Sequence, residues 1–380
     1  MRIKNLSQTD GISTHCLLFF SGYTLCFISY FLGDLVQTEY DFSTISDLLK
    51  YGSYLLFAIT AIHGSRRKRE FVAVVLLMLI GLVVMVYCDV YYFCILFVMA
   101  FGITQIEERS IWQYSFWLLV GLLTVTFLLC LFGVLDNIST PRYVGDPVDR
   151  FALGFSHSNV PPLILFYLSC YWIMIHKGDI RIRQYVVMAV LHLVTYQICM
   201  SRNVIILSSV LLLGSLLIKK IRFGPYITRL VSAVTSVIPL FFVVFSTIAT
   251  VKLNQYAIFQ TVDRLLSSRI SAAFRKMERL GLHLITSFDT DTFFSDGVVV
   301  DSAYSFMVIR YGLLVAVFVA LLIFVYAYRE RKDLYSTLVI LVIATANFID
   351  NDIFDYLCLP LMLIAIKTLI SGWKEARLNT

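Results

Sequence analysis

Long apolar stretches recur along the chain and are separated by short polar segments. A run of about 20 apolar residues is long enough to cross the hydrocarbon core of a bilayer as a helix. The pattern therefore predicts an all-α membrane protein with about twelve transmembrane helices and a single integral membrane domain over residues 1–380. The predicted spans cover residues 15–36, 47–63, 71–87, 89–104, 112–134, 159–175, 185–200, 203–218, 230–250, 302–327, 334–349 and 354–371.

The composition supports membrane insertion. Apolar residues make up 59% of the chain and charged residues 15%, and the mean hydropathy is +0.82. Soluble domains are about half apolar and about a quarter charged. The net charge of +6 does not indicate a nucleic-acid partner, because the basic residues form short clusters between apolar runs.

These basic clusters predict the orientation of the chain. Cytoplasmic loops of membrane proteins carry an excess of Lys and Arg, and alternating the predicted spans puts all the strongly basic loops on one side. We therefore expect both termini in the cytoplasm. The basic loops are Ser65–Glu70, His176–Gln184, Lys219–Gly224, Tyr328–Lys332 and Trp373–Arg377.

Two long segments fall on the opposite, outer side, at residues 135–158 and 252–301. The second contains apolar residues near helical spacing with cations between them, which is typical of an amphipathic helix at a membrane surface. Its cations would face lipid headgroups or an anionic ligand, and both interpretations stay open. The apolar positions are Leu266, Ile270, Phe274, Met277 and Leu284, and the cations are Arg269, Arg275, Lys276 and Arg279.

Polar residues gather in four further places that all fall on the predicted outer side. They are "RFALGFSHSN" at residues 150–159, "SRN" at 201–203, "DSAYSFMVIRYG" at 301–312 and "NFIDNDIFD" at 347–355. Because they share one side, these groups can meet in one site.

Arginines on the outer side oppose the usual charge rule, so each needs a local reason. Guanidinium groups clamp pairs of phosphate oxygens, and Arg150, Arg202 and Arg269 together would bind a diphosphate; alternatively they bind lipid headgroups. Arg310 lies roughly 13 Å along a helix from Asp301. At that depth it needs a wet cavity and a ligand, or a structural ion pair with a residue such as Asp350.

Two residues suit proton transfer. His157 has an ordinary pKa close to neutrality, and it stands among Ser156, Ser158 and Asn159 at a helix entry; a purely structural histidine is the alternative. Asp301 opens a predicted span, with Tyr304 one turn later, and would serve as a helix cap, as a base, or as both.

Other acidic residues carry weaker signals. The "DTD" at residues 289–291 resembles a divalent-metal pair, but no further ligands stand at matching spacing, so a solvated loop is favoured. Asp34 and Asp41 could supply an acidic group in the first outer loop. We expect neither a metal nor a cofactor.

The motifs together resemble the Wzy-type O-antigen and capsular polysaccharide polymerases of bacteria, which are related to O-antigen ligases. "RFALGFSHSN" is similar to their arginine–glycine–histidine–asparagine signature, and "MSRNVIIL" to the serine–arginine pair of their later half. "LLSSRI" followed by "VDSAYSFMVIRYG" resembles their large outer loop and next helix. The resemblance covers roughly residues 150–328. His283, and the aspartates Asp350 and Asp352 where relatives often have glutamate, depart from it.

This resemblance implies a GT-C-like membrane glycosyltransferase of the bacterial plasma membrane. Such enzymes join oligosaccharide units carried on undecaprenyl diphosphate into a surface polysaccharide, without nucleotide sugars or metals. The expected partners are the lipid-linked oligosaccharide, membrane lipids, and the flippase and chain-length regulator of the same pathway. Catalytic roles would fall to His157, Asp301, Arg202 and Arg269, and substrate binding to Arg150, Asn159, Tyr304, Arg275, Arg279 and Arg310.

Two other functions compete with polymerisation. An O-antigen-type ligase would transfer the finished glycan to a different acceptor. A flippase for lipid-linked oligosaccharides should have charged residues through the bilayer midplane and a repeat between its halves, whereas the ionisable groups here crowd at the outer face. A membrane scaffold would leave the outer arginines unexplained.

Overall fold

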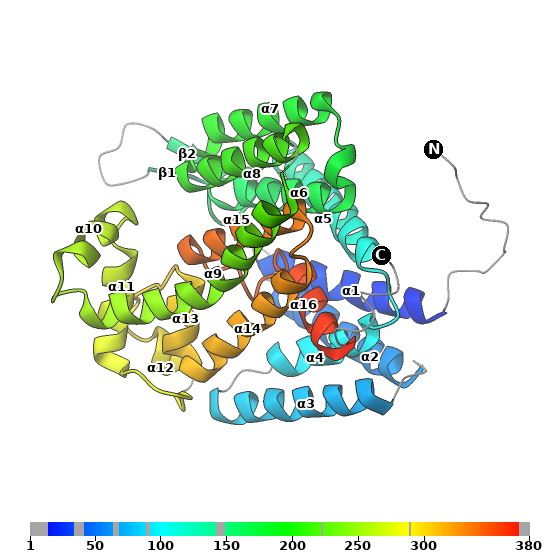
Figure 1. Ribbon diagram of the computed structural model, residues 1–380, viewed down its shortest axis with the longest axis horizontal. Coiled ribbons are helices and arrows are strands. Elements are labelled where there is room, and N and C mark those ends of the chain that lie inside the picture. The colour runs from blue at the N-terminus through cyan, green and yellow to red at the C-terminus, as the bar shows by residue number, and fades with distance from the viewer. Residues whose placement is uncertain are drawn as a thin grey trace.

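The computed structural model describes residues 14–33, 42–63, 68–88, 92–141, 149–221, 223–288 and 290–371. Within these ranges the chain forms α-helices and one small hairpin (Figure 1). The first half contains α1 (Thr14–Gly33), α2 (Ser43–His63), α3 (Lys68–Cys88), α4 (Tyr92–Ile103), α5 (Glu108–Leu131), β1 (Ser139–Pro141), β2 (Asp149–Phe151), α6 (Val160–His176) and the 3-10 turn η1 (Lys177–Asp179). The second half contains α7 (Ile182–Cys199), α8 (Arg202–Lys220), α9 (Pro225–Lys252), α10 (Ala257–Leu265), α11 (Arg269–Leu280), α12 (Thr290–Phe294), α13 (Ala303–Arg310), α14 (Leu313–Arg329), α15 (Leu334–Ile349) and α16 (Leu359–Ser371).

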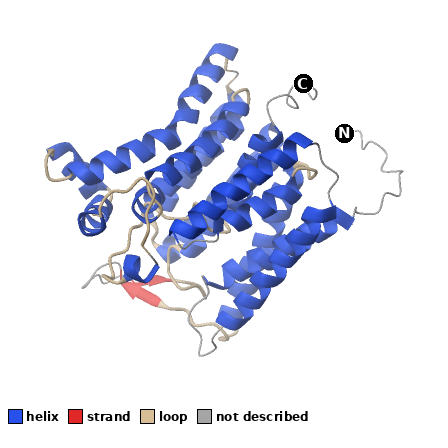
Figure 2. Ribbon diagram, turned by 90° about the horizontal axis from the view of Figure 1, so that it is seen from below, coloured by secondary structure: helices blue, strands red, loops and turns tan. Residues whose placement is uncertain are grey.

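The long helices pack side by side around a largely apolar core, and the antiparallel β1–β2 hairpin lies at one end of them (Figure 2). Helices α10, α11 and α12 project to one side of the long helices (Figure 1). Helix α6 is buried along most of its length and packs against α5, α7 and α8. The "RFALGFSHSN" stretch therefore ends directly at the N-terminus of a buried helix.

The helical class predicted from the sequence is confirmed, and every predicted span overlaps a helix. In the described part of the chain, α1, α3, α5, α6, α7, α8 and α9 are long and apolar enough to cross a membrane, and α14, α15 and α16 are shorter apolar helices. These properties fit an all-α polytopic membrane protein. The total of twelve spans stays a prediction.

The tenth predicted span, 302–327, is not continuous. It is divided at Tyr311 and Gly312, where Gly312 has a φ of +98°. The backbone of the preceding long segment fills the break: the N–H of Leu313 donates to the carbonyl of His283 at 3.0 Å, and that of Leu314 donates to Leu284 at 3.0 Å. The first donors of α14 are thereby satisfied by another segment of the chain.

The predicted amphipathic helix is also divided. α10 ends at Leu265 and α11 begins at Arg269, and the residues between them include Ser267 and Ser268 in the left-handed region. Ile270 and Met277 are buried as expected, whereas Leu284 lies beyond the end of α11 and is exposed. The apolar face of α11 packs on α9 and α13, so it is covered by protein.

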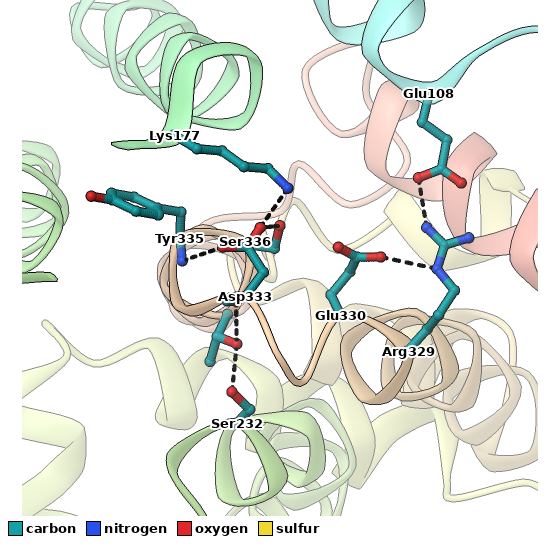
Figure 3. Close-up of polar contacts among 9 residues, drawn as sticks. Glu108, Lys177, Ser232, Arg329, Glu330, Asp333, Tyr335 and Ser336 are labelled. Carbon is teal, nitrogen blue, oxygen red and sulfur yellow. Dashed lines mark hydrogen bonds and ion pairs between the residues drawn. The ribbon is translucent and has the colours of Figure 1, made fainter. Parts of the chain in front are cut away.

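Three polar loops meet at one end of the bundle (Figure 3). Arg329 pairs with Glu108 at 2.6 Å and with Glu330 at 3.0 Å. Lys177 pairs with Asp333 at 2.5 Å, and Asp333 also accepts from the N–H of Tyr335 to cap α15. The loops before α5, after α6 and after α14 therefore share one end, in agreement with the sidedness predicted for them.

Gly312→Ala is expected to destabilise the protein. A Cβ at this position would stand 2.5 Å from the carbonyl oxygen of Leu284, and the φ of +98° strains any residue with a side chain. Such strain costs about 1–3 kcal/mol before the steric clash is counted. Thermal unfolding of the detergent-purified variant should show a lower Tm than wild type. Gly121→Ala, where a Cβ meets no atom within 4 Å, is the matched control, and equal Tm values for the two variants would contradict the expectation.

Candidate functional site

A pocket of about 340 Å³ opens at the opposite end of the helices from the Arg329 and Lys177 contacts. It lies where the turn between α15 and α16 meets the start of α6 and the chain leading into α13. Its lining residues are Asn159, Val160, Leu163, Phe294, Val299, Val300, Asp301, Phe306, Asp350, Asn351 and Asp352.

Arg269 joins two of the carboxylates that line this pocket. Its Nε lies 3.2 Å from Asp301 and its Nη2 lies 3.1 Å from Asp350, while Nη1 donates to the carbonyl of Ile349. The Arg269 side chain is 13% exposed, whereas that of Asp301 is 47% exposed. The guanidinium therefore faces inward, and it ties the first turn of α11 to the end of α15 and the entry to α13.

Asp350 is held at the end of α15 in a crowded, polar place. Its N–H donates to Ala346 at 2.7 Å, and its carbonyl accepts from the N–H of Ala303 at 3.4 Å. Burial raises the pKa of the Asp350 carboxyl above its ordinary value, and the nearby charge of Asp301 adds to the rise, while Arg269 opposes it. Burial and the like charge of Asp301 therefore favour the protonated form of Asp350, against the effect of Arg269.

The "RFALGFSHSN" stretch is fixed by local packing. Arg150 lies in β2 opposite Thr140 of β1. Gly154, with a φ of +91°, is pressed against α5, because a Cβ there would stand 3.0 Å from the Cβ of Cys130 and 3.2 Å from the carbonyl of Thr126. Phe155 is fully buried. The glycine of the motif is therefore required by a close approach of two backbones.

His157 follows this tight turn and remains exposed. Its Nδ1 accepts from the N–H of Asn159 at 3.1 Å, so the neutral ring carries its proton on Nε2. Partial burial lowers the pKa of His157 below its ordinary value, and the positive charge of Arg150 lowers it further, whereas Asp301 acts in the opposite direction. The structure thus brings His157, Arg150 and Asp301 into one electrostatic neighbourhood.

The Arg150 side chain is only partly exposed, and its buried Nε has no hydrogen-bond partner within the described chain. The hydroxyls of Ser158 and Ser302, each adjacent in sequence to a lining residue, are likewise buried without a partner there. Such groups are costly to leave unsatisfied. Ser158 lies just before α6 and Ser302 just before α13, the two elements whose starts adjoin the pocket.

Arg202 begins α8 and is exposed, and its side chain makes no hydrogen bond or ion pair with the described residues. Helices α8 and α15 are antiparallel neighbours, with Gly214 packed against Leu338. Arg202 lies twelve residues before Gly214 on α8. Asp350 lies twelve residues after Leu338, at the end of α15. At about 1.5 Å per residue the two ends stand at the same level. Arg202 therefore shares the end of the bundle that holds Arg269, without contacting it.

Arg310 and Tyr304 are buried beneath the site. The Arg310 guanidinium donates to the carbonyl of Phe288 and to Oγ1 of Thr290, both at 2.9 Å. The ion pair with Asp350 that the sequence suggested is not formed, because Arg269 occupies that carboxylate. Tyr304 is fully buried, and its hydroxyl has no hydrogen-bond partner among the described residues. Both residues hold the core together below the pocket.

The remaining cations of α11 take different positions. Arg275 is exposed, whereas Lys276 is fully buried, which corrects the expectation that it faces lipid headgroups or a ligand. Lys276 donates to Asp296 and to the carbonyl of Phe293, and Arg279 pairs with Asp296 at 2.9 Å. These two cations fasten the segment around α12 onto α11.

Several acidic residues have other outcomes. Asp301 is not the cap of α13: Ser302 holds that position, without a side-chain cap bond, and Asp301 faces Arg269 instead. Asp34, Asp41 and Asp289 lie outside the described residues. Over the residues that the structure describes, no three His, Cys, Asp or Glu side chains form a group that could hold a metal ion.

The sequence reasoning missed the apolar half of the pocket. Phe294 and Val299 line it, and neither of them stands in one of the motifs quoted above. A phenylalanine carries no distinguishing signal in a chain with 30 of them. His283 does not line the pocket, and its ring donates to the carbonyl of Leu280 at 2.8 Å.

No family model, curated protein or solved structure matches this chain. The resemblance to bacterial polysaccharide polymerases therefore rests on the short sequence motifs quoted above.

Arg269→Ala is expected to lower the stability of the protein. It leaves two carboxylates and the Ile349 carbonyl without their shared donor. Breaking a fully buried pair costs about 3–5 kcal/mol, and the exposure of Asp301 reduces this to roughly 2 kcal/mol. Adding Asp301→Asn and Asp350→Asn should restore part of the loss. Thermal unfolding is the measurement, with Arg275→Ala on the same helix as the control. A Tm for Arg269→Ala equal to that of the control would contradict the expectation.

Proposed function

We propose that this protein is a membrane glycosyltransferase that joins lipid-diphosphate-linked oligosaccharide units into a long polysaccharide at the outer face of a bacterial plasma membrane. The observation that carries the proposal is the single polar site at one end of the apolar bundle. Arg269, Asp301 and Asp350 meet there beside a pocket, with Arg150 and His157 adjoining and Arg202 at the same level.

The chemistry needs a stabiliser for the leaving group. An acceptor hydroxyl attacks the anomeric carbon of the donor, the carbon–oxygen bond to the diphosphate breaks, and the lipid diphosphate leaves with the bonding electrons. Negative charge grows on phosphate oxygens, and preorganised cations are commonly the largest contribution to such catalysis. Arg202 and Arg150 have guanidinium nitrogens that are not already occupied by protein groups, so we assign the diphosphate to them.

Arg269 has a different part in this proposal. Two carboxylates already neutralise its charge, so it contributes less to the diphosphate than a free arginine would. It orients Asp301 and Asp350 toward the pocket. This changes the role predicted from the sequence, in which Arg269 bound the diphosphate directly.

The proton of the acceptor hydroxyl needs a base. His157 suits this role because its lowered pKa keeps the imidazole neutral near pH 7. Asp301, which is half exposed at the pocket, is the second group able to accept the proton. The charges of Arg150 and Asp301 both act on His157, so the base and one of the two arginines that we assign to the diphosphate share one electrostatic neighbourhood.

Arg202→Ala should abolish long polymer and leave single lipid-linked units in cells, because it removes an exposed guanidinium that supports no described contact. Its abundance and Tm should equal those of wild type. Gel analysis of the polysaccharide ladder, with identification of the accumulated lipid intermediate, is the measurement. Arg183→Ala, an exposed arginine at the opposite end of the bundle, is the control. Normal polymer length from Arg202→Ala would refute the diphosphate assignment, and accumulation on the inner face would indicate a flippase.

The dependence of rate on pH should follow His157. A base must be deprotonated, so the rate falls as the pH drops through the pKa of His157, which lies below its ordinary value of about 6.5. Arg150→Ala removes a positive neighbour, raises this pKa and moves the acid limb to higher pH. Asp301→Asn removes a negative neighbour and moves it to lower pH. The kcat/KM profile of purified enzyme with lipid-linked units tests this. Shifts in the same direction for both variants would exclude His157 as the titrating group.

A further inference from the structure

We infer that the 340 Å³ pocket is the subsite for the terminal sugar of the acceptor, and that it accepts neutral or amino sugars and excludes acidic ones. This inference rests on the proposed function and adds the class of sugar to it.

The polar half of the pocket has the groups that bind sugar hydroxyls. Asp301, Asp350 and Asp352 supply carboxylate oxygens, and Asn159 and Asn351 supply amides. Carboxylates accept hydrogen bonds from neighbouring hydroxyls, and amides both donate and accept. Together they match a ring that carries several hydroxyls in fixed directions.

The apolar half matches the carbon–hydrogen face of a sugar ring. Phe294 and Phe306 line it together with Val299 and Val300, and Phe294 is 52% exposed. Small-molecule sites have volumes of about 300–1,000 Å³, so this pocket is at the small end of the range. It suits the end of a glycan better than a long segment of one.

The charge of the pocket selects among sugars. Three carboxylates line it, and Arg269 neutralises only part of their charge by contacting Asp301 and Asp350. An acidic sugar would bring a further carboxylate into this partly buried site, where the lining carboxylates would repel it. The same repulsion keeps a diphosphate out, so the donor leaving group belongs with Arg150 and Arg202, neither of which lines the pocket.

Asn159 connects the two halves of the reaction. Asn159 lines the pocket, and its backbone N–H donates to Nδ1 of His157 at 3.1 Å. A sugar held in the pocket is therefore next to the residue that orients the proposed base. In this tautomer Nε2 carries the ring proton, so His157 can accept the hydroxyl proton at Nε2 only after the ring proton has moved to Nδ1 and the hydrogen bond from Asn159 has opened. Otherwise Asp301 takes the proton.

Binding of simple sugars to the full-length protein in nanodiscs tests the inference without turnover. Saturation-transfer NMR at pH 6.5 would compare methyl β-glucoside, glucosamine and glucuronic acid. We expect the first two to bind wild type and glucuronic acid not to bind. Asp301→Asn should weaken glucosamine binding by about threefold, the size of one exposed ion pair, because the Asp301 side chain is half exposed at the pocket. Binding of glucuronic acid to wild type as strong as that of the glucoside, or no binding by any of the three, would overturn the inference.

A charge reversal gives the sharper comparison. Asn351→Lys places a cation at an exposed position of the pocket and should allow glucuronic acid to bind while weakening glucosamine by about threefold. Asn254→Lys makes the same change at an exposed position just beyond the end of α9, outside the pocket, and should alter neither. Equal effects of the two variants would overturn the inference. The polymer ladder of Arg202→Ala reports separately on the proposed function, so failure of either conclusion leaves the other testable.

Discussion

The pairing of Arg269 with Asp301 and Asp350 is the constraint on which the pocket end of this protein depends. These residues belong to three segments far apart in the sequence: Arg269 begins α11, Asp301 precedes α13, and Asp350 follows α15. The guanidinium fork holds them together because it can donate to two carboxylates and a carbonyl in different directions. Asp350 is mostly shielded from water, so its anion would be costly without this partner, whereas Asp301 is half exposed. The contact thereby holds two of the residues that line the pocket, Asp301 and Asp350.

A second set of contacts anchors the segment between α11 and α13 to the bundle. The break at Gly312 frees the first amides of α14, which donate to the carbonyls of His283 and Leu284. The N–H of Thr286 donates in turn to the carbonyl of Tyr311. Arg310 then fastens Phe288 and Thr290, and Lys276 and Arg279 fasten the chain around α12. Buried or half-buried cations thus anchor this segment at several points, and Phe294 and Asp301, which belong to it, line the pocket.

The arrangement separates charge in a way that suits group transfer between two bulky substrates. The carboxylates line the pocket, while Arg150 and Arg202 lie at the same end but outside its lining. In the proposed reaction, the diphosphate of the donor would be attracted to Arg150 and Arg202, and the hydroxyls of the acceptor would be attracted to the carboxylates of the pocket. His157 lies between these environments, and its pKa responds to both Arg150 and Asp301.

The sequence by itself determined the helices and their grouping by end. Runs of apolar residues specify helices locally, because a backbone in hydrocarbon must satisfy its own hydrogen bonds, and basic loops such as those at Lys177 and Arg329 fell together as expected. The tertiary structure alone decided which partner each polar residue has. Arg269, Lys276 and Arg310 looked alike as cations near an outer surface, yet one pairs with pocket carboxylates, one is buried against Phe293 and Asp296, and one binds a loop backbone. Such contacts join segments separated by tens of residues, and only the packing of the helices sets the distances between them.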